Sequence, residues 1–143
     1  MLDPQSVVRQ MWQAINDRDY PRVAGAIAER CVWVSVPAEH TFVGPEAMVR
    51  GLRSFAETFP DGRSEIEKLH AAGHVVVTEW RTTGTTADGR RLDRRGCSVA
   101  EVRGGKIVAY RDYFDRQTLT EQLGSAASAP TAAPADRPRR RPG

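Results

Sequence analysis

The residue of greatest chemical interest in this sequence is one carboxylate within an apolar stretch near residue 112. Alternate residues of a β-strand share a face, so a strand over residues 106–114 would turn Asp112 to the same side as three apolar or aromatic residues. These residues are Val108, Tyr110 and Phe114. A buried carboxylate is costly unless it finds hydrogen-bond donors or takes a raised pKa. A raised pKa suits a general acid or base, whereas a structural carboxylate held by neighbouring hydroxyls is the alternative.

Other predicted strands offer side chains that could accompany Asp112. Period-two spacing groups the following sets: Trp33 with Ser35; Thr78 with Trp80 and Thr82; and Arg94 with Gly96, Ser98 and Ala100. If these faces point inward together, they line a pocket with indoles, a phenol, hydroxyls, one acid and one guanidinium near its mouth. Such a lining favours a bulky apolar ligand held by few polar contacts, although an aromatic residue taken alone more often belongs to the plain core than to a ligand site.

The elements that would position these residues follow from apolar spacing and chain-breaking residues. Helices are predicted over residues 4–18, 20–29, 45–59 and 116–123, with Asp3 and Asp115 as N-caps. Strands are predicted over residues 31–36, 64–71, 75–85, 91–103 and 106–114, the last four joined by Gly-containing hairpin turns. Gly96 marks a bulge or a sharp bend. The order predicts an α+β fold, in which a cone of helices packs on a strongly curved antiparallel sheet and encloses one pocket.

Composition places the chain among ordinary soluble proteins. It has 143 residues, of which 40% are apolar and 27% charged, enough for one domain with a core. No apolar run approaches the roughly 20 residues of a membrane span, and the start lacks the features of a secretory signal. Two cysteines, Cys31 and Cys97, are too few for a disulfide scaffold. We therefore expect a cytoplasmic protein with no membrane contact.

The charge is uneven along the chain. Residues 124–143 contain four arginines, one acid and four prolines, and they account for the whole net charge of +3. This segment has no aromatic, Leu, Ile or Val to bury, so a disordered tail is expected there. Residues 1–123 would form the folded domain. Because that domain is neutral overall, binding to nucleic acid is not expected.

Several other functional patterns are absent from the sequence. His70 and His74 flank a Gly-containing turn and lack an acid or cysteine to complete a metal set, so no metal site is predicted. His40 is expected in a loop. Cys31 and Cys97 lie in strands without an activating neighbour in the sequence, which favours inert thiols. No phosphate-binding glycine loop and no Gly-x-Ser-x-Gly elbow occurs, and no cofactor is expected.

The run Gly105–Asp115 and the order of elements resemble the nuclear transport factor 2-like superfamily. The closest branch is the SnoaL-like one, which holds polyketide cyclases, ketosteroid isomerases and limonene-epoxide hydrolases. The likeness covers about residues 5–123 and includes Val43-Gly44-Pro45-Glu46 and Phe59-Pro60-Asp61. It implies a fold that hosts many activities and a homodimer.

The Arg-Asp-Tyr-Phe-Asp stretch is closest to the limonene-epoxide hydrolases, whose aspartate here helps to hold and deprotonate the attacking water. The resemblance implies that role for Asp112. The family's water-holding tyrosine and asparagine correspond to Trp33 and Ser35, and its arginine and proton-donating aspartate to Trp80 and Thr82. Where ketosteroid isomerases carry their proton-shuttling carboxylate, this chain has Val36. A cyclase-like pocket with one acid/base residue is what remains.

The sequence therefore predicts a cofactor-free enzyme for a bulky apolar metabolite of polyketide or terpenoid type. Asp112 would assist ring closure, isomerisation or epoxide opening. The alternatives are a non-catalytic binding protein that uses the same pocket, and a partner-binding role of the outer sheet face. The predicted catalytic residues are Asp112, Tyr110 and Ser35. The predicted substrate contacts are Trp33, Phe55, Phe59, Trp80, Thr82, Ser98 and Phe114.

Overall fold

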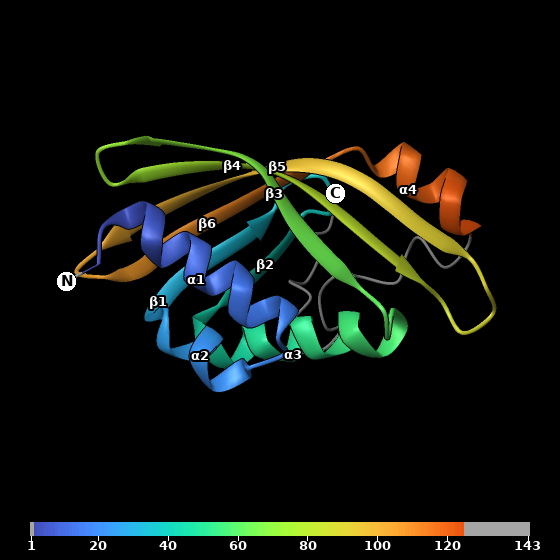
Figure 1. Cartoon of the computed structure of the whole chain (residues 1–143), viewed down its shortest axis with the longest axis horizontal. Helices are drawn as coiled ribbons and strands as arrows, with labels where there is room; N and C mark the ends of the chain where they lie inside the picture. The colour runs from blue at the N-terminus through green and yellow to red at the C-terminus, as the bar shows by residue number, and fades with distance from the viewer. Residues whose placement is uncertain (1, 125–143) are drawn as a thin grey trace, which may run out of the picture.

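The helices and strands occur in the order α-α-β-β-α-β-β-β-β-α (Figure 1). The structure is a computed structural model that describes residues 2–124. Its helices are α1 (Pro4–Asn16), α2 (Tyr20–Gly25), α3 (Gly44–Thr58) and α4 (Arg116–Leu123). Its strands are β1 (Ile27–Ser35), β2 (His40–Val43), β3 (Arg63–Ala72), β4 (Val75–Thr85), β5 (Arg91–Arg103) and β6 (Lys106–Phe114).

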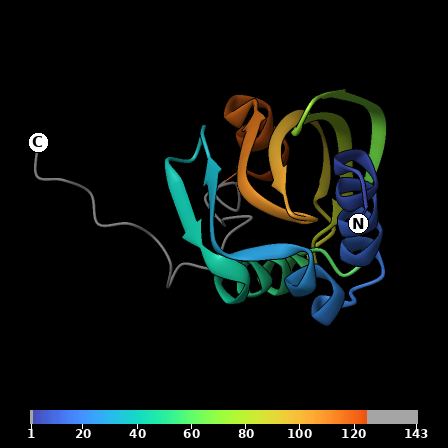
Figure 2. The same ribbon diagram turned by 90° about the vertical axis from the view of Figure 1, so that its left-hand side faces the viewer.

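All six strands form a single bent sheet in the order β2-β1-β6-β5-β4-β3. Figure 2 shows this sheet curling around a space that α1 and α3 close from two sides. The predicted α+β fold is confirmed. One pair differs from the expected antiparallel arrangement, because β1 runs parallel to β6. The sheet is therefore mixed, and this parallel pair places Ser35 directly beside Asp112.

Two elements near the N-terminal third differ from the sequence prediction. The helix expected to reach residue 29 ends at Gly25, and residues from Ile27 onward join β1 instead. The sheet supplies the reason: Ile27 pairs with Ile107, and the backbone N–H of Ile107 donates to the Ala26 carbonyl at 2.8 Å. His40 was expected in a loop, but it is buried in β2 opposite Ser35. Its strand was missed because it spans only four residues.

The core fills the space between the inner face of the sheet and helices α1 and α3. Its largest members come from α1, α3 and all strands except β3, among them Met11, Met48 and Tyr110. A smaller cluster joins Phe59 to Leu92, Leu119 and Leu123, and it fixes α4 against β5. Both predicted caps are confirmed: the Asp3 carboxylate accepts from the Ser6 N–H at 2.9 Å, and Asp115 accepts from the Gln117 N–H at 2.9 Å.

The residues predicted as a tail lie almost entirely outside the part of the chain that the structure describes, which ends at Gly124. A disordered tail therefore stays a prediction. Among residues 2–124, no helix is both long enough and apolar enough to cross a membrane.

Gly96 is needed for close packing, and of the two alternatives predicted here, a bulge or a sharp bend, the bulge is not formed. The ladder runs without a register shift from Trp80 through Gly96 to Phe114, and the irregularity in β5 lies instead between Glu101 and Val102. The Trp80 indole lies across Gly96. A Cβ at this position would overlap that ring and would come 2.7 Å from the Tyr113 carbonyl oxygen.

Gly96→Ala is therefore expected to lower the free energy of unfolding by about 1–3 kcal/mol, the usual cost of overpacking a core. Gly25→Ala is the matched control, because a Cβ there meets no atom within 4 Å. Alanine is favoured over glycine in a helix by up to about 1 kcal/mol, so this control should be neutral or stabilising. Urea denaturation measures both. Equal stability of the two variants would contradict the packing role of Gly96.

Candidate active site

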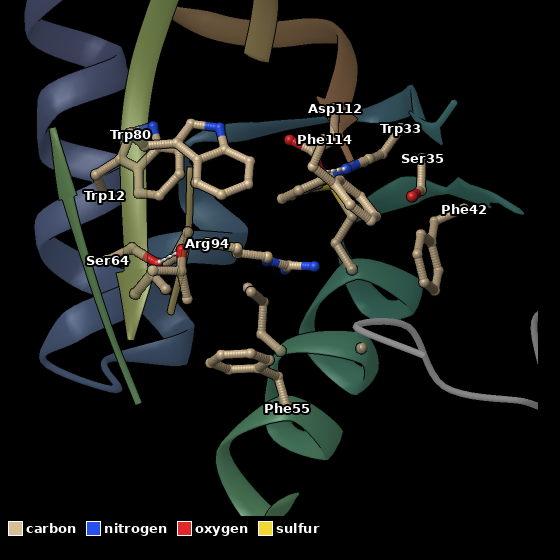
Figure 3. A pocket seen from close by; sticks show the side chains of 15 residues that line it. Trp12, Trp33, Ser35, Phe42, Phe55, Ser64, Trp80, Arg94, Asp112 and Phe114 are labelled. Carbon is tan, nitrogen blue, oxygen red and sulfur yellow. Dashed lines mark hydrogen bonds between the residues drawn. The ribbon is translucent and has the colours of Figure 1, made fainter. Parts of the chain in front are cut away.

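A pocket opens between the inner face of the sheet and the helices α1 and α3. Its empty space, including the open solvent at its mouth, is about 730 Å³. Figure 3 shows the side chains that line it. They are Trp12, Ile15, Trp33, Ser35, Phe42, Met48, Gly51, Leu52, Phe55, Ser64, Trp80, Thr82, Arg94, Asp112 and Phe114. All three tryptophans of the chain are among them.

The pairing of strands brings the predicted inward faces together. One row crosses four neighbouring strands: Thr78 lies opposite Ser98, Ser98 opposite Asp112, and Asp112 beside Ser35. The next residue pairs on the same face place Trp80 opposite Gly96 and Thr82 opposite Arg94. The face assignments made from period-two spacing hold for these residues but not for Val108. A register shift between Glu101 and Val102 interrupts the alternation near the start of β6, so that Ile107 is buried in the core and Val108 is not part of it.

Asp112 is held at the pocket wall by two neutral donors. The Trp33 indole Nε1–H donates to Oδ2 at 2.6 Å, and the Ser98 hydroxyl donates to Oδ1. Ser98 is itself oriented, because its oxygen accepts a hydrogen bond from the Trp80 indole Nε1–H at 2.7 Å. This chain of hydrogen bonds fixes the direction of the carboxyl group. A carboxylate has about four lone-pair sites, so Asp112 retains acceptor capacity toward the pocket.

Burial controls the acidity of Asp112. Enclosure of the carboxyl group by protein atoms raises its pKa from 3.8 to about 6, and the hydrogen bonds from Ser98 and Trp33 and the positive charge of Arg94 limit this rise. The residue as a whole is only half-buried because it borders the open pocket. Near neutral pH, both protonation states are therefore accessible, which is the condition for acid/base work.

Arg94 is the second charged residue of the pocket wall. Period-two spacing predicted its guanidinium near the pocket mouth, but Arg94 was not among the predicted catalytic residues or substrate contacts. Arg94 is only 8% exposed. Its guanidinium carbon lies 4.5 Å from the ring centre of Phe114 and 5.5 Å from that of Trp80. Burial lowers its pKa to about 10, against the opposing effect of Asp112. At neutral pH the group is a cation.

The other predicted site residues divide into three groups. Trp33, Ser35, Phe55, Trp80, Thr82 and Phe114 line the pocket as expected. Ser98 lies behind the wall and reaches the site only through Asp112. The structure does not place Tyr110 or Phe59 on the wall: Tyr110 is 1% exposed and stacks on Trp33 at 4.2 Å between ring centres, and Phe59 belongs to the smaller core cluster. Both residues are apolar enough to pack in the core. The spacing of residues along a strand or helix does not distinguish a core position from one at the pocket wall.

Titratable groups elsewhere in the described residues do not converge. Residues 2–124 contain no cluster of three or more His, Cys, Asp or Glu side chains that could hold a metal ion. Cys31 and Cys97 are free thiols, and burial raises the pKa of Cys31 to about 11. The outer sheet face carries ion pairs such as Arg81–Asp93 and Arg111–Glu101. The homodimer stays a prediction.

The raised pKa of Asp112 gives a pH-dependent effect on stability. The folded protein holds this proton more tightly than the unfolded chain does, so ionisation between about pH 4 and pH 6 destabilises the fold. Asp112→Asn removes that cost. The difference in free energy of unfolding between the variant and the wild type should therefore be about 1–3 kcal/mol more favourable to the variant at pH 8 than at pH 4. Urea titrations at both pH values measure this. A constant difference between variant and wild type, or a carboxyl that titrates near pH 4 by NMR, would contradict the burial argument.

Comparison with known proteins agrees with this architecture. Residues 8–110 match the family model of the SnoaL-like domain. No curated protein matches the sequence. The solved structures of similar fold include an NTF2-like protein of unknown function from Burkholderia pseudomallei K96243. It is 20% identical, with a TM-score of 0.77 over 87% of this chain and 99% of that one.

Two further similar structures come from proteins with a stated activity. IdmH from Streptomyces antibioticus, a proposed polyketide cyclase, is 21% identical with a TM-score of 0.76, over 86% of this chain and 99% of its own. An LEH-like epoxide hydrolase from M. tuberculosis is 24% identical with a TM-score of 0.72, over 82% of this chain and 86% of its own. At these identities the likeness shows the fold alone.

Proposed function

Since the chain belongs to the SnoaL-like family, we propose that it is a cofactor-independent enzyme in which Asp112 moves a proton on a bulky, mainly apolar metabolite. The observation that carries this proposal is a carboxyl group at the pocket wall with a pKa raised to about 6. A polyketide- or terpenoid-like substrate suits the apolar lining. Similar folds in a proposed polyketide cyclase and an epoxide hydrolase are consistent with such chemistry.

Ring closure and isomerisation fit the site better than epoxide opening does, because both can begin with the deprotonation of carbon. Asp112 is the only carboxylate among the described lining residues, so epoxide opening lacks a second acid for the epoxide oxygen. Deprotonation next to a carbonyl needs one base and one group that stabilises the enolate oxygen. Asp112 would take the proton from carbon, the electron pair would move onto the carbonyl oxygen, and Arg94 lies on the same wall to stabilise that charge. Ring closure or isomerisation can follow from such an enolate.

A test needs no knowledge of the natural substrate. We use 2-tetralone in D₂O, a bicyclic ketone whose acidic C–H exchanges for deuterium when a base removes the proton. The wild type should accelerate this exchange above buffer, with a rate that rises through about pH 6 as Asp112 ionises. Asp112→Asn should lower the protein-dependent rate by about 10²-fold, the low end of acid/base contributions. Proton NMR follows the exchange.

Glu57→Gln is the control, because Glu57 is an exposed carboxylate of α3. It should exchange 2-tetralone as fast as the wild type. A wild-type rate that equals buffer, or an Asp112→Asn rate that equals the wild type, would contradict the proposal.

A non-catalytic binding role in the same pocket is the second candidate. Trp80 and Thr82 stand where the resemblance to epoxide hydrolases implies an arginine and an acid, and both oxygens of Asp112 already accept hydrogen bonds from the protein. The two candidates differ in outcome: a protein that binds 2-tetralone and leaves its exchange at the buffer rate is a binding protein.

A further inference from the structure

The Arg94 guanidinium is a buried cation with unpaired donors. Within residues 2–124, its Nε and Nη1 atoms have no hydrogen-bond partner, and the side chain forms no ion pair. The flanking rings of Phe114 and Trp80 interact with its charge through their faces. They cannot accept the guanidinium N–H groups in the manner of an oxygen. Buried donors of a charged group are costly when they have no hydrogen-bond partner. A ligand that accepts hydrogen bonds from them would remove this cost.

Asp112 does not serve as that partner. Each of its oxygens accepts from a neutral donor, Trp33 or Ser98, and the influence of Asp112 on Arg94 is electrostatic. The two residues lie on the paired strands β6 and β5, and both line the pocket. Figure 3 shows the Arg94 side chain extending into the middle of the pocket rather than along its wall.

The rest of the lining offers no competing charge. Among residues 2–124, Arg94 and Asp112 are the only charged residues that line the pocket, and the contributions from α1, α3, β1 and β2 are apolar, aromatic or, in Ser35 alone, hydroxyl. On the strands near Asp112, the other titratable groups that sense its charge are Tyr110 and Cys97. A ligand oxygen with a full negative charge would meet one fixed cation in a mainly apolar cavity whose other charged residue is Asp112.

We propose that Arg94 binds a carboxylate of the ligand, so that the natural substrate is an apolar molecule with one acid group. This inference rests on the proposed function for the location of the substrate and adds its chemical class. Planar guanidinium and carboxylate groups match in a bidentate geometry. A monoanion balances the single charge of Arg94, whereas a phosphate monoester brings nearly two negative charges and would leave one uncompensated in the cavity.

The charge balance also links the ligand to Asp112. A bound carboxylate would take the charge of Arg94 and repel an ionised Asp112, so binding would favour the protonated form of that residue. With an acid ligand bound, Asp112 would then act as the proposed base only at a pH above this further raised pKa.

Binding of 2-naphthoate is compared with that of 2-naphthamide, its neutral analogue of the same shape, by isothermal titration calorimetry. At pH 5.5 the naphthoate is ionised and Asp112, with its pKa raised to about 6, is mainly neutral. The wild type should bind naphthoate at least about tenfold more tightly than naphthamide, as expected for a charged hydrogen bond. Arg94→Gln should lose this preference, and Arg94→Lys should keep part of it.

Arg95→Gln is the matched control. Arg95 is the next residue of β5, lies on the outer face and pairs with exposed Glu67, so its loss removes the same charge without touching the pocket. It should keep the wild-type preference. Circular dichroism checks that each variant is folded. If Arg94→Gln does not fold, the preference for naphthoate over naphthamide in the wild type and in Arg94→Lys tests the role of Arg94.

Asp112→Asn separates this inference from the proposed function. It should lose 2-tetralone exchange but bind naphthoate at least as tightly as the wild type, because the repelling charge is gone. Equal affinity of the wild type for the two naphthyl ligands, no binding of naphthoate, or a full preference in folded Arg94→Gln would overturn the role of Arg94. None of these results depends on whether Asp112 catalyses exchange.

Discussion

The burial of one carboxyl group is the constraint around which this pocket is built. Asp112 is tolerable inside the protein only because Trp33 and Ser98 donate to it, and Ser98 is held in turn by Trp80. The Trp80 indole reaches Ser98 only because position 96 has no side chain. A glycine on one strand thus determines the orientation of an acid on the next, through packing rather than through any polar contact of its own.

The electrostatics of the site follow from two opposite charges in an apolar enclosure that do not touch. Direct contact would neutralise both groups and leave little chemistry to do. Without such contact among the described residues, burial leaves Asp112 with a pKa raised to about 6 and Arg94 with unpaired donors. Because charges interact strongly at low dielectric, a ligand that enters between them changes the protonation of one and completes the hydrogen bonding of the other.

The fold limits the function less than the site does. Similar architecture occurs in a proposed cyclase, an epoxide hydrolase and proteins of unknown function, and a fold by itself selects none of these. On the inner faces of β1 and β4, this chain presents Trp33, Trp80 and Thr82 to the pocket. Two indoles and a hydroxyl leave Asp112 as the one carboxylate of the described lining, on which the proposed proton transfer depends.

From the sequence alone, strand periodicity determined which residues share the inner face, and turn and cap residues determined most elements, because both signals are local. The parallel pairing of β1 with β6, the short strand β2 and the end of α2 at Gly25 depended on distant partners. Residue spacing likewise placed Asp112 on the inner face but could not separate pocket wall from core, and Tyr110 and Phe59 lie in the core. Only tertiary packing decided that Arg94 is buried with two unpaired nitrogen atoms, because burial depends on which other elements pack against the residue.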